Sequence, residues 1–253
     1  MAPTIIIVPG SFAPVSLYNN FLQVARAAGL SIDIISTPSV GRKPEGQAPG
    51  TMADDVSVIV AKIEPLLDEG KEVILLTHSY GGVPGTQSLE VLSKKARNKQ
   101  GKTSGVDKVI YLTSVVLPVG ASNWDMSQGN FPDYLTIRDD YMTIDPVGNA
   151  PKCFNDLNPD DALAAAKEFS EHATGSFKEK LTYAGYTDLD EVHYLFCEDD
   201  LVIPVQGQEA MIGLLKDARG ERLTKVHKLK AGHCPTHSMP ERLSQVLKEI
   251  VQA

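Results

Sequence analysis

Short apolar segments alternate with amphipathic segments along almost the whole chain. The short segments are runs rich in Ile, Val and Leu, and the amphipathic ones carry apolar residues three or four positions apart. This alternation is typical of βαβ units, which build a mostly parallel sheet with helices on both faces, so the sequence predicts the α/β class. The predicted strands are 4–8, 31–35, 72–77, 106–116, 191–196 and 223–229, and the predicted helices are 15–28, 51–69, one beginning near Gly81, 204–215 and 240–251.

Two segments interrupt the alternation. Residues 94–105 are basic and polar, which indicates either a site for an anion or a partner, or a solvated surface insertion; we favour the insertion, because charge runs usually face water. Residues 118–188 are too long for one loop, and they contain several aromatic residues and a predicted helix at 160–171. We expect 118–188 to form a lid over the strand ends, and 1–117 with 189–253 to form the core.

A serine follows the third predicted strand, in the hexapeptide THSYGG at positions 77–82. A serine between a strand and a helix, with small residues beside it, is typical of a nucleophile elbow. The helix that follows directs its free N–H groups and the positive end of its dipole at such a site. Thr77 stands where the elbow usually has a glycine, so the alternative reading of Ser79 is a helix N-cap before a glycine turn.

A serine hydroxyl becomes a good nucleophile only when a base takes its proton, and that base needs an orienting carboxylate. His233 follows the last predicted strand and is our candidate base, with His237 as the alternative. Asp200 follows the fifth predicted strand and is the candidate acid, with Asp199 as the alternative. Parallel strands end at one edge of the sheet, so we predict that Ser79, Asp200 and His233 form a catalytic triad.

Backbone N–H groups on two loops are expected to hold an oxyanion. Tyr80 directly follows the candidate nucleophile, and Ser11 lies in the loop after the first strand, where Gly10 allows a close backbone approach. Aromatic side chains of that loop and of the lid are expected to contact the substrate. The candidates are Phe12, Trp124, Tyr134 and Tyr183.

These segments resemble the α/β-hydrolase superfamily, and in particular the branch of plant hydroxynitrile lyases and methylesterases and of many small fungal and bacterial hydrolases. The resemblance implies an α/β-hydrolase fold, with Ser79, Asp200 and His233 on the family's triad, and Ser11 and Tyr80 on its oxyanion hole. The matching stretches are 5–10, 54–68, 70–71, 78–85, 153–157, 197–211 and 231–235, which together run through nearly the whole chain.

The chain departs from this branch at three places. Hydroxynitrile lyases of the branch carry a lysine directly after the catalytic histidine, and here that residue is Cys234. The usual His-Gly after the first strand is Pro9-Gly10, and residues 10–14 lack the histidine that is often found there. We therefore expect the oxyanion loop to have a different shape.

We consider three functions for a chain with these candidate residues. The first is hydrolysis of an ester or lactone of a small, largely apolar metabolite. The second is a lyase, isomerase or cyclase of specialised metabolism that uses Ser79 and His233 as a proton relay. The third, a non-catalytic binding protein, is disfavoured by the complete set of triad residues. A serine at the elbow also argues against haloalkane dehalogenation and the usual epoxide-hydrolase chemistry, which need a carboxylate there.

Composition limits the expected partners and compartment. A net charge of −8 and a pI near 5.3 disfavour nucleic acid and anionic membranes. Three cysteines and an N-terminus without a basic, long apolar segment favour a reducing, cytoplasmic location without a signal peptide. The sequence has no zinc motif or nucleotide loop, so we expect no metal or cofactor, and a small molecule as the partner. It leaves homodimer formation open.

Overall fold

A six-stranded parallel sheet forms the centre of the molecule. The computed structural model describes residues 2–220, 222 and 224–252. Its strands run in the order β2-β1-β3-β4-β8-β9, which confirms the predicted α/β sheet; the predicted start of the last strand at Leu223 lies outside the described residues. The strands are β1 (Thr4–Val8), β2 (Ser31–Ile34), β3 (Val73–His78), β4 (Lys108–Leu112), β8 (Glu191–Cys197) and β9 (Thr224–Leu229).

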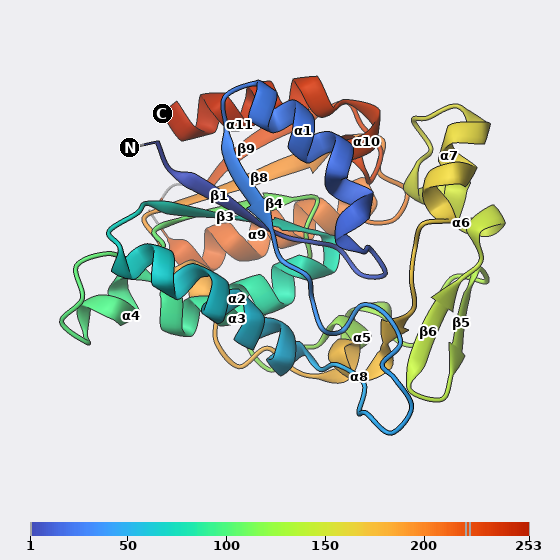
Figure 1. The fold of residues 1–253 in the computed structure, drawn as a ribbon, viewed down its shortest axis with the longest axis horizontal. Coiled ribbons are helices and arrows are strands. Elements are labelled where there is room, and N and C mark those ends of the chain that lie inside the picture. Colours follow the sequence, from blue (N-terminus) through green and yellow to red (C-terminus); the bar gives the residue numbers. More distant parts are fainter. Residues whose placement is uncertain (1, 221, 223, 253) are drawn as a thin grey trace.

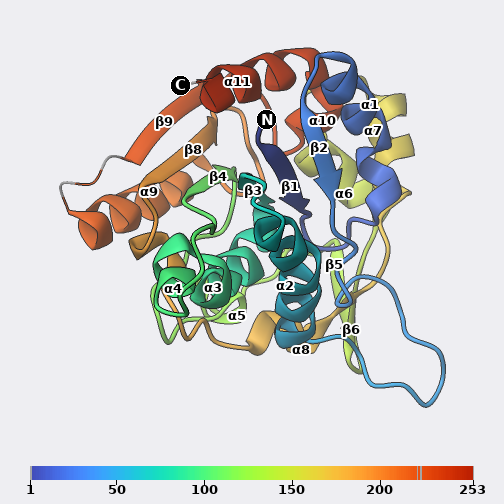
Figure 2. The same cartoon turned by 60° about the vertical axis from the view of Figure 1, so that its left-hand side comes forward.

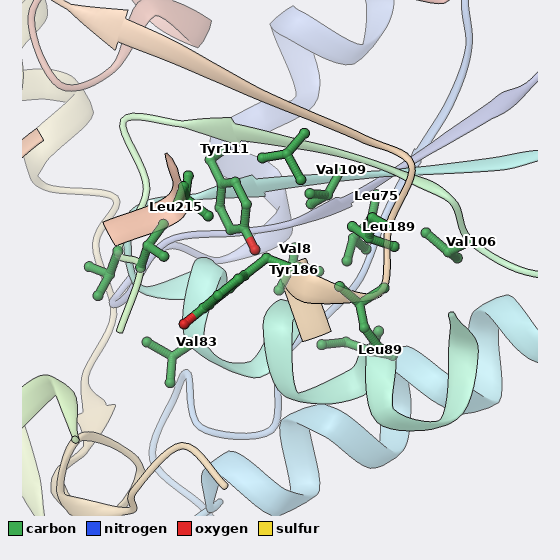
Figure 3. Close-up of a cluster of buried hydrophobic side chains, with 14 of the residues drawn as sticks. Val8, Leu75, Val83, Leu89, Val106, Val109, Tyr111, Tyr186, Leu189 and Leu215 are labelled. Carbon is green, nitrogen blue, oxygen red and sulfur yellow. The ribbon is translucent and has the colours of Figure 1, made fainter. Parts of the chain in front are cut away.

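Helices cover both faces of this sheet, because alternate side chains of each buried strand point to opposite sides. Ile5 and Ile7 of β1 pack with α1 and α11, which lie together on one side (Figure 1). Ile6 and Val8 pack with α2, α3 and α9 on the other side, and Figure 3 shows part of that second cluster. These helices are α1 (Asn19–Ala27), which continues a 3-10 turn η1 (Val15–Tyr18), α2 (Met52–Asp68), α3 (Gly82–Leu92), α9 (Val205–Arg219) and α11 (Pro240–Gln252).

Local sequence explains where α2 begins. The Thr51 side chain accepts a hydrogen bond from the Asp54 N–H, and the Asp54 carboxylate accepts one from the Thr51 N–H. This reciprocal pair is a capping box, which satisfies N–H groups that have no partner inside the helix. No described helix is both long and apolar enough to cross a lipid bilayer.

The basic segment 94–105 is more ordered than a solvated insertion. It contains α4 (Lys94–Asn98), whose Arg97 is 1% exposed. The Arg97 guanidinium forms ion pairs with Glu64 and Asp68 of α2, and its Nε–H donates to the Ser104 carbonyl oxygen. The expectation of a solvated surface run is thus wrong for Arg97, whose buried guanidinium is paired with two partly exposed acidic residues one turn apart on α2.

Residues 118–188 form several small elements, and Figure 1 shows α6, α7, β5 and β6 together at one end of the molecule. The predicted helix at 160–171 is shorter than expected, because it ends at Ala166. A few residues later His172 pairs with Met142 in a small antiparallel sheet. The elements are α5 (Asn123–Ser127), β5 (Leu135–Arg138), β6 (Tyr141–Ile144), α6 (Pro146–Cys153), α7 (Pro159–Ala166), β7 (His172–Ala173), α8 (Thr174–Lys178) and η3 (Gly185–Thr187).

The loop after β2 runs past the β5–β6 hairpin (Figure 2). Val40 forms an isolated β-bridge with His172, and the Lys43 N–H donates to the Tyr141 hydroxyl at 3.0 Å. The Arg42 guanidinium forms an ion pair with Glu171. The 118–188 segment is therefore attached to the core on the side of β2 as well as through its own two ends.

Candidate active site

The candidate residues lie at the carboxyl ends of four strands. Ser11 follows β1, Ser79 follows β3, Asp200 follows β8 and His233 follows β9. The chain passes from β1 to β2 on one side and then to β3 on the other, so β1 and β3 flank the point where the strand order reverses. The crevice outside the strand ends at such a point is the usual ligand site of open α/β sheets.

Ser79 sits on a sharp turn between β3 and α3. Its φ angle is +52°, a left-handed conformation that costs free energy for a residue with a side chain. The turn continues as a single 3-10 turn, η2 (Ser79–Gly81), before α3 begins. A Cβ atom at Gly81 would overlap the Val8 carbonyl oxygen, and one at Gly82 would overlap the Val115 carbonyl oxygen. The two glycines therefore let the turn pack directly against β1 and the end of β4.

Ser79, His233 and Asp200 form one continuous hydrogen-bonded path. The Ser79 Oγ lies 3.0 Å from His233 Nε2, and His233 Nδ1 lies 2.8 Å from Asp200 Oδ2. All three residues are buried. Since Asp200 can only accept as a carboxylate, His233 donates its Nδ1–H to it and turns Nε2 to the serine hydroxyl. This is the geometry in which an imidazole can take the proton of a serine.

Other groups hold the Asp200 carboxylate in place. The N–H groups of Val202 and Ile203 donate to its Oδ1 at 2.7 and 2.9 Å, and the Thr113 hydroxyl donates to Oδ2. Burial acts to raise the pKa of Asp200, but the charge of His233 and these hydrogen bonds outweigh burial and lower that pKa. Thr113 follows β4, and nothing in the local sequence marks it as a partner of Asp200.

His233 has an unusually basic ring. Burial disfavours the charged imidazolium, but the negative charge of Asp200 and its hydrogen bond to Nδ1 outweigh burial and raise the pKa of His233 to about 9. The neighbouring His78 is shifted the other way, since burial and the charge of His233 lower its pKa to about 3. His78 is therefore neutral, while His233 is the ring that can gain and lose a proton.

Neutral His78 connects His233 to the loop after β1. Its Nε2–H donates to the His233 carbonyl oxygen at 2.9 Å, so its Nδ1 accepts from the Tyr18 hydroxyl at 2.7 Å. The Tyr18 oxygen in turn accepts from the Gly10 N–H at 3.1 Å. This buried chain of hydrogen bonds links the backbone of Gly10 to the backbone of His233.

Ser170 and His172 hold the loop after β1 through hydrogen bonds to Phe12. The Phe12 N–H donates to His172 Nδ1 at 3.3 Å, and the Phe12 carbonyl oxygen accepts from the Ser170 N–H at 2.7 Å. Burial lowers the pKa of His172 to about 3, which keeps the ring neutral and able to accept. Within the described chain the Ser11 N–H has no hydrogen-bond partner. Sequence reasoning missed His172, because it lies about 160 residues from its partner.

Tyr80, the residue after Ser79, is fixed by its side chain. Its hydroxyl donates to Asp55 Oδ2 at 2.8 Å, and its ring stacks on Phe177 with centroids 5.3 Å apart. Asp55 also accepts from the N–H and the hydroxyl of Ser39. Burial raises the pKa of Asp55 to about 6 in spite of these hydrogen bonds. The Tyr80 N–H is at the start of η2 and α3, where backbone donors lack partners inside the helix.

A cavity of about 210 Å³ opens above Ser79 and His233. Its wall includes Phe12 and Tyr134, two of the predicted substrate-binding residues. The other two lie outside the wall formed by the described residues: Trp124 packs on Phe131, and Tyr183 donates to Asp188. Most of the remaining wall is apolar, and its apolar members include Leu17, Val115, Leu135, Ile144, Phe169 and Ile203.

The alternative acid and base take other positions. The Asp199 side chain is exposed, while its N–H donates to the Ala231 carbonyl oxygen. His237 lines the cavity, but its ring packs edge-on against Phe154 and its Nδ1 lies 3.2 Å from the Thr236 hydroxyl. Neither residue contacts Ser79 among the hydrogen bonds of the described chain.

The cysteine beside His233 is neutral. Burial raises the pKa of the Cys234 thiol well above its usual value, and its sulfur lies 3.5 Å from that of Cys153. Both residues line the cavity. No group of three or more His, Cys, Asp or Glu side chains in the described ranges is arranged to hold a metal ion.

Comparison with known proteins identifies the family. Residues 5–246 match the model of the alpha/beta hydrolase family, and the chain belongs to that family. The chain is 38% identical over 249 residues to "Probable hydrolase R7" of a Phoma species, with 98% of each chain covered. It is 23% identical to "Alpha/beta hydrolase nvfD" of Aspergillus novofumigatus, with 98% of this chain and 96% of the relative covered. The protein is therefore a hydrolase of the α/β-hydrolase type.

Solved structures share the fold. The pyrethroid hydrolase from Sphingobium faniae JZ-2 superposes with a TM-score of 0.72 at 19% identity, covering 100% of this chain and 98% of the other. Polyneuridine aldehyde esterase gives a TM-score of 0.74 at 16% identity, with 99% of both chains covered. These neighbours, together with a plant methylesterase from Arabidopsis at a TM-score of 0.73 and 15% identity over 99% of both chains, confirm the resemblance inferred from the sequence.

Proposed function

We propose that this protein is a serine hydrolase that cleaves an ester or lactone bond in a small, largely apolar metabolite. Ser79 is the nucleophile, His233 the general base and Asp200 the orienting carboxylate. The observation that carries the proposal is the unbroken hydrogen-bonded path from Ser79 Oγ through His233 to Asp200, at the floor of a mainly apolar cavity.

The reaction follows from these positions. Ser79 Oγ attacks the acyl carbon while His233 Nε2 takes the hydroxyl proton, and the N–H groups of Ser11 and Tyr80 hold the resulting oxyanion. His233 then gives that proton to the leaving alkoxide, so an alcohol departs and an acyl-enzyme remains. Water attacks the acyl carbon, His233 accepts its proton and returns it to Ser79 Oγ, and the carboxylic acid is released.

Two further observations favour ester hydrolysis. Structural neighbours are named as esterases of polyneuridine aldehyde and of methyl esters, and another as a pyrethroid hydrolase, on a shared fold. The residue after His233 is also neutral Cys234, whereas the resembling hydroxynitrile lyases carry a cationic lysine there. The site thus has a nucleophile, a base and oxyanion donors for acyl transfer, and it lacks the lysine of those lyases.

A covalent serine probe tests the proposal directly. We expect a fluorophosphonate to label the protein once, on Ser79, and to abolish turnover of short-chain aryl esters, because the activated Oγ attacks phosphorus as it attacks an acyl carbon. Peptide mass spectrometry locates the label, and the Ser79→Ala protein is the blank. Turnover that continues while Ser79 stays unlabelled would instead support the lyase, isomerase or cyclase alternative with Ser79 and His233 as a proton relay.

The pH profile of kcat/KM is the second expected result. General-base catalysis needs neutral His233, and its pKa is raised to about 9, so kcat/KM rises with pH by about tenfold per unit and levels off near pH 9. Removing the carboxylate in Asp200→Asn leaves burial as the main influence, which lowers the pKa of His233 and moves the rising limb to lower pH. A limb that stays in place in Asp200→Asn would contradict the assigned partnership.

A further inference from the structure

Three asparagines of the 118–188 segment line the same cavity as Ser79, and two of them are buried while Asn130 is exposed. Asn123 is the first residue of α5 and is 7% exposed, and Asn149 lies in α6 and is 2% exposed. Neither side-chain amide makes a hydrogen bond to any part of the described chain; Asn123 Oδ1 and Asn149 Nδ2 are fully buried without a partner. Buried amides are normally paired, because burial takes away their hydrogen bonds to water.

The fold does not require either amide. An asparagine near a helix start usually caps backbone N–H groups, as Asn158 does for α7. In α5 the capping box is already formed by Ser122 and Asp125, and in α6 the Asp145 carboxylate caps the Gly148 N–H. Asn123 and Asn149 are thus left unpaired on a cavity wall, which is a local loss of stability typical of residues kept for a ligand.

The other atom of each amide, Asn123 Nδ2 and Asn149 Oδ1, also has no partner in the described chain and is not fully buried, so it is the atom that a ligand in the cavity can reach. An amide oxygen needs a donor and an amide N–H needs an acceptor, and a hydroxyl group supplies both. We propose that Asn123 and Asn149 bind hydroxyl groups of the substrate, so that the substrate is a hydroxylated, otherwise apolar ester or lactone. The hydroxyl recognition rests on the two amides alone, while the identity of the cleaved bond rests on the proposed function.

The cavity is large enough to hold a small aromatic ester. A cavity of about 150 Å³ in another protein holds one benzene, and this one measures about 210 Å³. A phenyl ring with a short ester arm is therefore a suitable probe. Polar groups left without a partner strongly reject a ligand that lacks the matching hydroxyl.

The experiment compares methyl phenylacetate with its three ring-hydroxylated derivatives, the ortho, meta and para isomers. We expect at least one hydroxylated ester to exceed the parent ester in kcat/KM by tenfold or more. In Asn123→Leu and Asn149→Leu this ratio falls toward one, whereas in Asn98→Leu, an exposed asparagine of α4, the ratio stays as in the unaltered protein. Equal kcat/KM for the parent and all three isomers overturns the proposal.

Two measurements without turnover separate this proposal from the proposed function. In Ser79→Ala protein, calorimetry is expected to show the favoured hydroxylated ester binding tenfold or more tightly than the parent ester; this result without any hydrolysis by the unaltered protein keeps the hydroxyl site and rejects the hydrolase. The Asn→Leu variants are also expected to have a higher Tm, because leucine removes an unpaired buried amide at similar volume. A lower Tm with an unchanged selectivity ratio shows a structural role and overturns the proposal.

Discussion

Ser79→Ala is expected to lower kcat/KM toward esters by about 10,000-fold or more while the fold is retained. The substitution removes the Oγ that lies 3.0 Å from His233 Nε2, so no acyl-enzyme can form. Alanine has a Cβ like serine and keeps the same turn at φ +52°, which is why the structure should tolerate it. The residual rate comes from the oxyanion donors and substrate binding alone.

The matched control is Ser57→Ala. Ser57 is an exposed serine of α2 whose hydroxyl donates to the Ala53 carbonyl oxygen, and it is not among the described residues that line the cavity. We expect its kcat/KM to stay within about twofold of the unaltered protein and both variants to give the same circular dichroism spectrum. Ester turnover by Ser79→Ala within tenfold of the unaltered protein, with the fold intact, would exclude Ser79 as the nucleophile.

Gly82→Ala is expected to have the largest effect on stability, lowering the free energy of unfolding by about 4 kcal/mol or more. A Cβ at Gly82 would overlap the Val115 carbonyl oxygen and the Ser114 hydroxyl. Neither can retreat easily, because the Val115 N–H and the Ser114 hydroxyl both donate to the Ser79 carbonyl oxygen at the elbow. The strain therefore passes directly into the turn that presents Ser79.

The control variant is expected to change the free energy of unfolding in the opposite direction. Gly213 lies inside α9, and a Cβ there would meet no atom within 4 Å. Gly213→Ala should raise the free energy of unfolding by about 0.5–1 kcal/mol, because alanine loses less backbone entropy in a helix. Urea denaturation of both variants measures the two values. Similar free energies for Gly82→Ala and Gly213→Ala would show that the elbow can relax.

The sequence predicted the central sheet well, because burial on both faces requires continuous apolar strands with a period that is easy to recognise. The same reasoning placed Ser79, Asp200 and His233 after strand ends, and the structure brings these three together. Thr113 and His172 were not predicted. Each acts through a hydrogen bond to a residue at least 87 positions away, and no local pattern marks such a contact.

The 118–188 segment was the least predictable part. Its strands have two to four residues, too few for a clear alternation, and β7 is recognisable only through its pairing with β6. The aromatic residues Trp124 and Tyr183 suggested a substrate surface, but the Trp124 ring packs on Phe131 and the Tyr183 hydroxyl donates to Asp188. The segment's two unpaired asparagines became visible only when burial and hydrogen bonding could be read together.

The contacts around Phe12 make the cavity wall and the chemical machinery interdependent. Most of the wall beyond the strand ends comes from one contiguous stretch, which suggests that substrate preference could be exchanged by transplanting residues 118–188 from a relative. That stretch also carries Ser170 and His172, which hold both backbone groups of Phe12. A chimera must therefore keep Ser170 and His172 together with Phe12. Without these hydrogen bonds the new cavity wall would lie beside a loop that no longer holds the Ser11 N–H in position.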